Sequence, residues 1–154
     1  MFNNKYLSLV IIVLITFLAS SIGGVVTSIY KEPWYSQIIQ PSFSPPSWVF
    51  GPVWTTLYIL MSIAIWYNWI LNKNSKTLKI YFVHLFFNGI WSVIFFAFHQ
   101  ILLALLNLLI ILFFIFWLMK IYLKNSKLSF LLMIPYLLWS SYALMLNTTI
   151  FYLN

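Results

Sequence analysis

Long uninterrupted apolar stretches constrain the fold of this chain more than any other feature of its sequence. An α-helix rises about 1.5 Å per residue, so roughly 20 apolar residues cross the hydrocarbon core of a bilayer, which is about 30 Å thick. Five stretches of the sequence meet this requirement. They predict transmembrane helices over residues 6–29, 46–71, 80–98, 101–123 and 128–151.

The composition supports an all-α membrane protein in which these five helices form one bundle. Hydrophobic residues make up 64% of the 154 residues and charged residues 6%, more apolar surface than a water-soluble domain of this size could bury. We therefore expect a single domain over residues 1–154, embedded in a lipid bilayer. Lys5 precedes the first apolar stretch as in a signal peptide, but the stretch is long and no Ala-x-Ala site follows it. The absence of cysteine excludes disulfides and thiolate metal sites.

The lysines predict the orientation of the bundle. The eight cations are all lysine and lie between the apolar stretches, a pattern typical of membrane orientation rather than of nucleic-acid binding. With five spans, the N-terminus and the expected basic loops at 72–79 and 124–127 share one side. That side carries Lys5, Lys73, Lys76, Lys79, Lys120, Lys124 and Lys127. Only Lys31 lies on the other side, so the positive-inside rule predicts a cytoplasmic N-terminus, with the first connection and the C-terminus opposite.

Polar and aromatic residues inside the spans recur at helical spacing and form three stripes. The stripes are His84, Asn88, Trp91, Ser92 and Phe95; Trp54, Tyr58, Met61 and Ile65; and Pro135, Trp139, Ala143 and Asn147. One interpretation is packing, with asparagine side chains bonding between helices and aromatic rings at the membrane interfaces. The other is a shared, nearly uncharged pocket, because polar groups within a bilayer are costly and mark functional sites. Such a pocket suits a flat, largely apolar molecule.

Conventional enzyme chemistry finds little support in the sequence. Glu32 is the only acidic residue, so there is neither a carboxylate pair nor a nucleophile–base–acid set. His84 and His99 lie on separate segments, and no metal site is expected. Haem ligation by His84 is conceivable, but a lone histidine on an aromatic helix face is more typical of a hydrogen-bonded core residue.

One proposed sterol-binding pattern, Leu/Val followed by Tyr and then Lys/Arg, occurs at the cytoplasmic end of the fourth span. Leu118, Tyr122 and Lys124 match it, although the pattern is weak. A lysine extending toward water beside an interfacial tyrosine explains these residues equally well.

The connection from Tyr30 to Ser47 is polar and rich in proline. Pro41, Pro45 and Pro46 stiffen it and oppose helix formation, while Pro46 or Ser47 is a plausible start for the second span. Trp48 would then lie at the interface, with Trp54 about two turns deeper. This arrangement predicts a rigid lid leading into a helix with an inward aromatic face.

Three sequence motifs follow one another along the chain. The first spans Trp34–Tyr35, Gln40–Pro41 and Pro45–Tyr58, the second is FNGIWSVIFF over residues 87–96, and the third is PYLLWSSYALMLN over residues 135–147. In this order they resemble the TspO/MBR family, the tryptophan-rich sensory proteins, also called translocator proteins or peripheral-type benzodiazepine receptors. The second motif is similar to the family's third-helix pattern Leu-Asn-x-x-Trp-Ser-x-x-Phe-Phe, and the third to its fifth-helix pattern Pro-Tyr-x-x-Trp-x-x-Phe-Ala-x-x-Leu-Asn. The resemblance covers essentially the whole chain.

The resemblance implies a five-helix bundle, often dimeric, that binds tetrapyrroles such as protoporphyrin IX or haem in a sensing, stress-response or transport role and requires no cofactor. Some members also bind cholesterol or benzodiazepine-type drugs. Gly23 and Gly24 would permit the close helix approach that a homodimer needs. The positions that match the family's ligand contacts are Tyr35, Pro45, Trp54, Asn88, Trp91, Ser92, Trp139 and Ala143. Tyr58 and Phe95 join this set from the helical stripes.

Two alternatives remain at the level of sequence. Some bacterial relatives promote light-dependent porphyrin breakdown, and Trp54 and Trp139 match the tryptophans implicated there. The other alternative is a small membrane subunit that binds a partner protein and no ligand. The chain also departs from the family pattern, with Gln40 at a common lysine position and Asn107 where many members carry an acid. Its C-terminus lacks the basic residue of the eukaryotic sterol motif.

Overall fold

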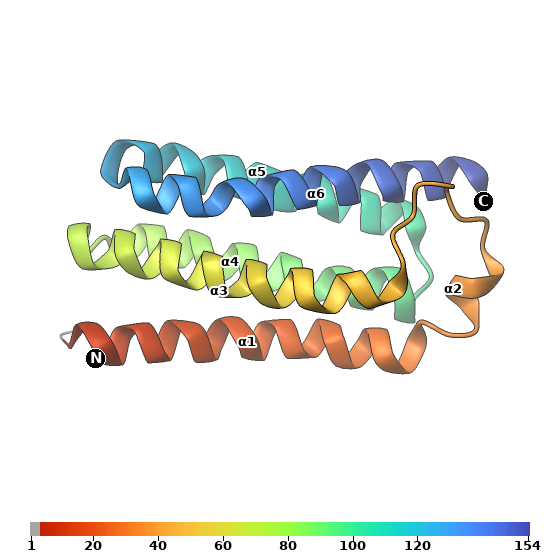
Figure 1. Cartoon of the computed structure of the whole chain (residues 1–154), viewed down its shortest axis with the longest axis horizontal. Coiled ribbons are helices and arrows are strands. Elements are labelled where there is room, and N and C mark those ends of the chain that lie inside the picture. The colour runs from red at the N-terminus through yellow and green to blue at the C-terminus, as the bar shows by residue number, and fades with distance from the viewer. Residues whose placement is uncertain (1–3) are drawn as a thin grey trace.

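The computed structural model describes residues 4–154 and consists of helices joined by short connections (Figure 1). The elements are α1 (Lys5–Tyr30), α2 (Trp34–Gln37), α3 (Ser47–Asn72), α4 (Ser75–Ser92), the π-helix η1 (Val93–Ala97), α5 (Ile101–Asn125) and α6 (Lys127–Leu153). Five spans are long and apolar enough to cross a membrane, with α4 and η1 forming one of them. The prediction of an all-α, multi-pass membrane protein with five transmembrane helices is therefore confirmed.

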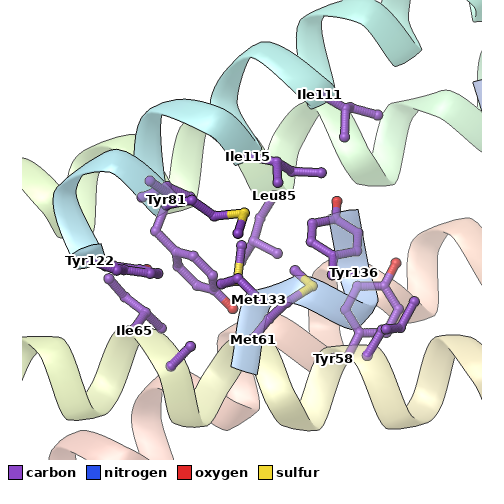
Figure 2. Packing of buried hydrophobic residues seen from close by; sticks show 14 of the residues in the cluster. Tyr58, Met61, Ile65, Tyr81, Leu85, Ile111, Ile115, Tyr122, Met133 and Tyr136 are labelled. Carbon is purple, nitrogen blue, oxygen red and sulfur yellow. The ribbon is translucent and has the colours of Figure 1, made fainter. Parts of the chain in front are cut away.

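The five spans pack side by side as a closed ring. Helix α1 contacts α3 and α4, α3 also contacts α6, and α5 closes the ring between α4 and α6. Successive spans run in opposite directions (Figure 1), so α2 and the C-terminus lie at the same end of the bundle. Inside the ring, Figure 2 shows side chains from α3, α4, α5 and α6 meeting in one cluster, including Met61, Tyr81, Ile115 and Tyr136.

The basic loops are much shorter than the sequence predicts. Helix α4 begins at Ser75 rather than near residue 80, because the Asn74 side chain accepts a hydrogen bond from the Lys76 amide at 3.0 Å and caps the helix. Ser126 caps α6 in the same way, accepting from the Ser129 amide at 3.1 Å. The predicted extents of these two loops, residues 72–79 and 124–127, are therefore wrong. Hydropathy marks where a helix enters the hydrocarbon, whereas capping residues mark where it begins.

The first connection contains a helical turn, whereas its prolines predict no helix there. Helix α2 forms ahead of the three prolines, directly after Pro33, and proline is well tolerated at a helix start. The connection is attached to α6 at two points. The Tyr142 hydroxyl donates to the Phe43 carbonyl at 2.7 Å. The Asn154 side chain exchanges two hydrogen bonds with the Ile39 backbone, at 2.9 and 3.1 Å.

Helix α3 begins at Ser47, as predicted, and Pro52 lies within its first two turns. The predicted turn at His99 and Gln100 is also present, with His99 in the left-handed region at φ 55°. Directly before it, the Phe98 amide donates to the Val93 carbonyl at 3.0 Å, which closes the wide turn of η1. Such π turns occur frequently at functional sites, and this one follows directly after Trp91 and Ser92.

Candidate functional site

A chain of buried polar side chains connects α3, α4 and α6 in the middle of the bundle. The Tyr58 hydroxyl donates to Oδ1 of Asn88, and Nδ2 of Asn88 donates to the Tyr136 hydroxyl oxygen at 2.8 Å. The Tyr136 hydroxyl also lies 2.7 Å from Nε2 of His84. These four side chains are at most 7% exposed. Each hydrogen bond except that of His84 to Tyr136 involves Asn88, so this amide joins the three helices.

Trp54 forms the aromatic wall above this chain. Its ring stacks on Tyr58 with centroids 5.4 Å apart and an interplanar angle of 27°. It also meets Tyr136 edge-on at 6.2 Å. These separations lie within the usual range for interacting aromatic pairs. Trp54 is only half-buried, so it presents a stacking surface beside groups that donate and accept hydrogen bonds.

A second aromatic cluster lies toward the first connection. Trp91 stacks on Phe95 with centroids 4.9 Å apart and an interplanar angle of 13°. Tyr35 meets the edges of Phe95 and Phe96 at 6.2 and 5.6 Å. Burial raises the pKa of the Tyr35 phenol above its usual value, so this group stays neutral at physiological pH. Trp91 packs against both aromatic clusters and thereby joins the predicted third-helix residues to the lid.

Trp139 lines an apolar groove between α3 and α6, with a volume of about 550 Å³. The groove walls are Pro52, Val53, Thr56, Leu57, Pro135, Leu138, Trp139 and Tyr142. Trp139 also meets Phe50 edge-on at 5.9 Å. Leu57, which forms part of the groove wall, also belongs to the buried core cluster that contains Tyr58. Ala143, one helical turn after Trp139, is half-buried against the main core.

The structure brings most of the predicted residues into two neighbouring clusters, but not onto one surface. Tyr58 contacts both Trp54 and Asn88, and Trp91, Phe95 and Tyr35 form the adjacent cluster. Pro45 is half-buried in the lid. Ser92 lies elsewhere, on the side of α4 that faces α1, where its Oγ is 3.2 Å from the position of a Cβ built on Gly23.

Two residues of the site were not among the predicted contacts. Tyr136 is the central member of the polar chain and lies directly after the Pro135 of the third motif, a position from which its partners could not be inferred. His84 was predicted as a hydrogen-bonded core residue rather than as a haem ligand, and its bond to Tyr136 agrees with that reading. No group of three potential metal-ligating residues occurs in the described part of the chain.

Two asparagines serve as interhelical links rather than as pocket groups. Asn107 donates to the Phe87 carbonyl at 2.9 Å, and Asn147 donates to the Ile101 carbonyl at 3.2 Å. The sterol pattern is not displayed to lipid either, because Leu118 and Tyr122 are both 0% exposed. Tyr122 packs inside the bundle, whereas Lys124 is exposed.

Comparison with known proteins agrees with the three motifs. The TspO/MBR family model matches residues 10–153. A tryptophan-rich protein TspO of Chlorobaculum tepidum is 31% identical over 156 residues, covering 99% of both chains. A tryptophan-rich sensory protein of Cereibacter sphaeroides is 32% identical, covering 91% of this chain and 90% of the relative. A human translocator protein is 33% identical, covering 84% of this chain and 82% of the relative.

Proposed function

The chain belongs to the TspO/MBR family, and we propose that it binds a tetrapyrrole, protoporphyrin IX or haem, within the membrane in a sensing, stress-response or transport role. The observation that carries the proposal is the stack of Trp54 on Tyr58 above the Tyr58–Asn88–Tyr136 hydrogen bonds. It places flat aromatic surfaces beside a few neutral donors and acceptors. A planar macrocycle with apolar faces and polar ring nitrogens has the complementary chemistry.

The groove between α3 and α6 offers a route to this site from the lipid. Its volume of about 550 Å³ lies within the usual range of ligand pockets, roughly 300–1,000 Å³. Trp139 and Leu57 lie in its wall, and Leu57 belongs to the same core cluster as Tyr58 and Tyr136. An apolar ligand would enter along this groove and displace the Trp54 ring from Tyr58. The connection from Lys31 to Pro46 would cover the bound ligand, because Tyr142 and Asn154 attach it to α6.

The same proposal includes the orientation and the homodimer. The lysine-rich end of the bundle would face the cytoplasm, and the lid and the C-terminus would face the opposite side. The groove of about 430 Å³ between α1 and α4 includes Ala19 and Gly89. Ala19 and Gly89 pack against each other within one chain. The proposed contact between two copies would therefore use the exposed apolar side chains of this groove, Ile15, Ile22 and Phe86.

Tryptophan fluorescence tests the binding proposal directly. Protoporphyrin IX added to the detergent-solubilised protein should quench the fluorescence saturably, and Trp139→Phe combined with Asn88→Ala should weaken the binding. Trp117→Phe is the matched control, because Trp117 is 43% exposed on the lipid-facing side of α5. Quenching that stays linear with porphyrin, or an unchanged affinity in the double variant, would contradict the proposal. A purification dominated by another protein, without porphyrin binding, would favour the partner-subunit alternative.

A second candidate function is light-dependent porphyrin degradation, and the position of Trp54 favours it. The Trp54 ring contacts both Tyr58 and Tyr136, so an oxidised indole would have neighbouring electron donors. Illumination of the complex should then give a new absorbing product that is lost in Trp54→Phe or Trp139→Phe. Equal bleaching of free porphyrin would show that the protein acts only as a carrier.

A further inference from the structure

We propose that Tyr136 and His84 form a proton-coupled electron-donor pair that reduces Trp54 after this tryptophan has lost an electron. The pair is defined by the 2.7 Å contact between the Tyr136 hydroxyl and Nε2 of His84. It is adjacent to Trp54, whose ring meets the Tyr136 ring at 6.2 Å. The pair itself follows from this geometry, whereas its use in light-driven chemistry rests on the proposed tetrapyrrole ligand.

The hydrogen bonds around Tyr136 provide a path for its proton to His84. Asn88 accepts the Tyr58 proton through Oδ1, so its Nδ2 is the group that faces Tyr136 and donates to it at 2.8 Å. The Tyr136 oxygen accepts one hydrogen bond from Asn88. In the His84 tautomer that carries its proton on Nδ1, Nε2 is free to accept the Tyr136 proton, and this is the tautomer that the proposal requires. An imidazole nitrogen with a free lone pair is a base, which an amide or a hydroxyl is not.

Tyr136 differs in this respect from the other buried tyrosines of the bundle. Tyr58 donates to an amide oxygen, and Tyr81 lies 2.8 Å from the Thr16 hydroxyl. The Tyr122 hydroxyl has no hydrogen-bond partner among the described residues. Figure 2 shows the four rings distributed along the interior of the bundle. Tyr136 is thus the one of these four whose phenolic proton has a basic acceptor.

The coupling matters because oxidation makes a phenol strongly acidic. Removal of an electron from Tyr136 without loss of the proton would leave a phenol radical cation, which is a far stronger acid than an imidazolium. Transfer of the proton across the existing 2.7 Å hydrogen bond avoids that species. No rearrangement of the backbone is needed for the transfer.

The reaction balances as follows. A photoexcited aromatic ligand takes one electron from Trp54 and becomes a radical anion, leaving the indole as a radical cation. Tyr136 gives one electron to the indole, and its phenolic proton moves to Nε2 of His84. The products are a neutral Trp54, a neutral tyrosyl radical and an imidazolium. When the ligand radical anion returns the electron to Tyr136, the proton moves back from His84, and every group is restored.

The consequence is protection of the binding site. A tryptophan radical cation that persists beside oxygen is open to irreversible oxidation. The pair moves the oxidising equivalent onto a side chain that is 0% exposed and returns it with its proton. Each cycle of illumination would then leave the Trp54 stacking surface intact.

The experiment uses the full chain in lipid nanodiscs without porphyrin, with tryptophan oxidised by a pulsed ultraviolet laser. Time-resolved absorption and electron paramagnetic resonance follow the tryptophan radical and its replacement by a tyrosyl radical. In the parent protein we expect conversion to a tyrosyl radical that slows in deuterated buffer after full exchange. Tyr136→Phe should remove most of that conversion, and His84→Gln should slow it several-fold. Tyr122→Phe and Tyr81→Phe are the matched controls and should behave like the parent.

Three results would overturn the proposal: an undiminished tyrosyl yield in Tyr136→Phe, an undiminished rate in His84→Gln, or no isotope effect in the parent protein. The isotope effect is measured without any substitution, so the proposal stays testable even if a variant misfolds. Trp54→Phe should lower the yield of tyrosyl radical. An unchanged yield would also overturn the proposal, because another tryptophan would then be the source. Because no porphyrin is present, failure of this experiment is distinct from failure of the porphyrin titration.

Discussion

The hydrogen bond between Tyr58 and Asn88 gives the most direct measure of how the candidate site is held together. Replacing Asn88 by leucine introduces an apolar side chain with the same branching. It removes the acceptor for Tyr58 and the donor to Tyr136. Interhelical hydrogen bonds in membrane proteins contribute about 0.6 kcal/mol on average and up to about 1.7 kcal/mol. A buried hydroxyl left without a partner costs about 1–3 kcal/mol. Asn88→Leu should therefore lower the free energy of unfolding by about 2–3 kcal/mol.

A double-mutant cycle separates this bond from the rest of the substitution. Tyr58→Phe alone should cost about 1–2 kcal/mol, because it leaves Oδ1 of Asn88 unpaired. In the double variant neither group remains unpaired, so its cost should fall short of the sum of the single costs by about 1 kcal/mol.

The free energy of unfolding of all three variants is measured by reversible unfolding in mixed lipid–detergent micelles. Circular dichroism follows the loss of helix as the fraction of sodium dodecyl sulfate increases. Thr55→Val is the matched control, since the exposed Thr55 hydroxyl bonds only to the Gly51 carbonyl of its own helix. It should change stability by less than about 0.5 kcal/mol. If the cost of the double variant equals the sum of the two single costs within about 0.3 kcal/mol, Tyr58 and Asn88 are not coupled and the reasoning is refuted.

Three further predictions concern the helix contacts, the orientation and the lid. Gly89→Leu should destabilise the bundle by about 1–3 kcal/mol, because a Cβ there would lie 3.2 Å from the Ala19 carbonyl oxygen. Gly24→Leu, with nothing within 4 Å of its Cβ, should be nearly neutral in the same unfolding assay. Because the chain has no cysteine, Asn74→Cys should react with a membrane-impermeant maleimide only after cells are opened, whereas Ser42→Cys should react in intact cells. The opposite pattern would reverse the proposed orientation. Tyr142→Phe should increase hydrogen exchange in the lid, around Phe43, without changing exchange in α4; unchanged exchange at the lid would show that this bond does not hold it.

The spans were predictable because the thickness of the bilayer fixes their length, so the apolar stretches alone locate them. The start of α4 at Ser75 was not, because lysine and threonine in its first turns lower the hydropathy without opposing a helix. Helix α2 was missed for a related reason. The prolines at 41, 45 and 46 predict no helix in the connection. They oppose helix only locally, however, and Trp34–Gln37 precede them.

Helical spacing places Trp54, Tyr58 and Asn88 on inward faces, and Tyr58 does contact both of the others. Helical spacing cannot show that Asn88 bonds to Tyr136. That pairing depends on how far α4 and α6 are shifted relative to each other along the bundle axis. Ser92 shows the limit of the same approach. It follows Asn88 by four residues, which rotates it about 40° around the helix, and that rotation is enough to turn it toward Gly23 of α1.

The polar chain suggests how the site would respond to a ligand. Phenylalanine and leucine would fill the places of Tyr58, Tyr136 and Asn88 without the cost of burying polar groups in a membrane, so these residues point to chemistry rather than to stability. Their hydrogen bonds hold α3, α4 and α6 in fixed register. The Trp54 side chain is held by ring contacts and makes no hydrogen bond to residues 4–154. A ligand that replaces the stack on Tyr58 would therefore move one indole ring and leave the hydrogen bonds intact. On this argument the polar chain is the rigid floor of the site, Trp54 is its movable wall, and binding requires little rearrangement of the helices themselves.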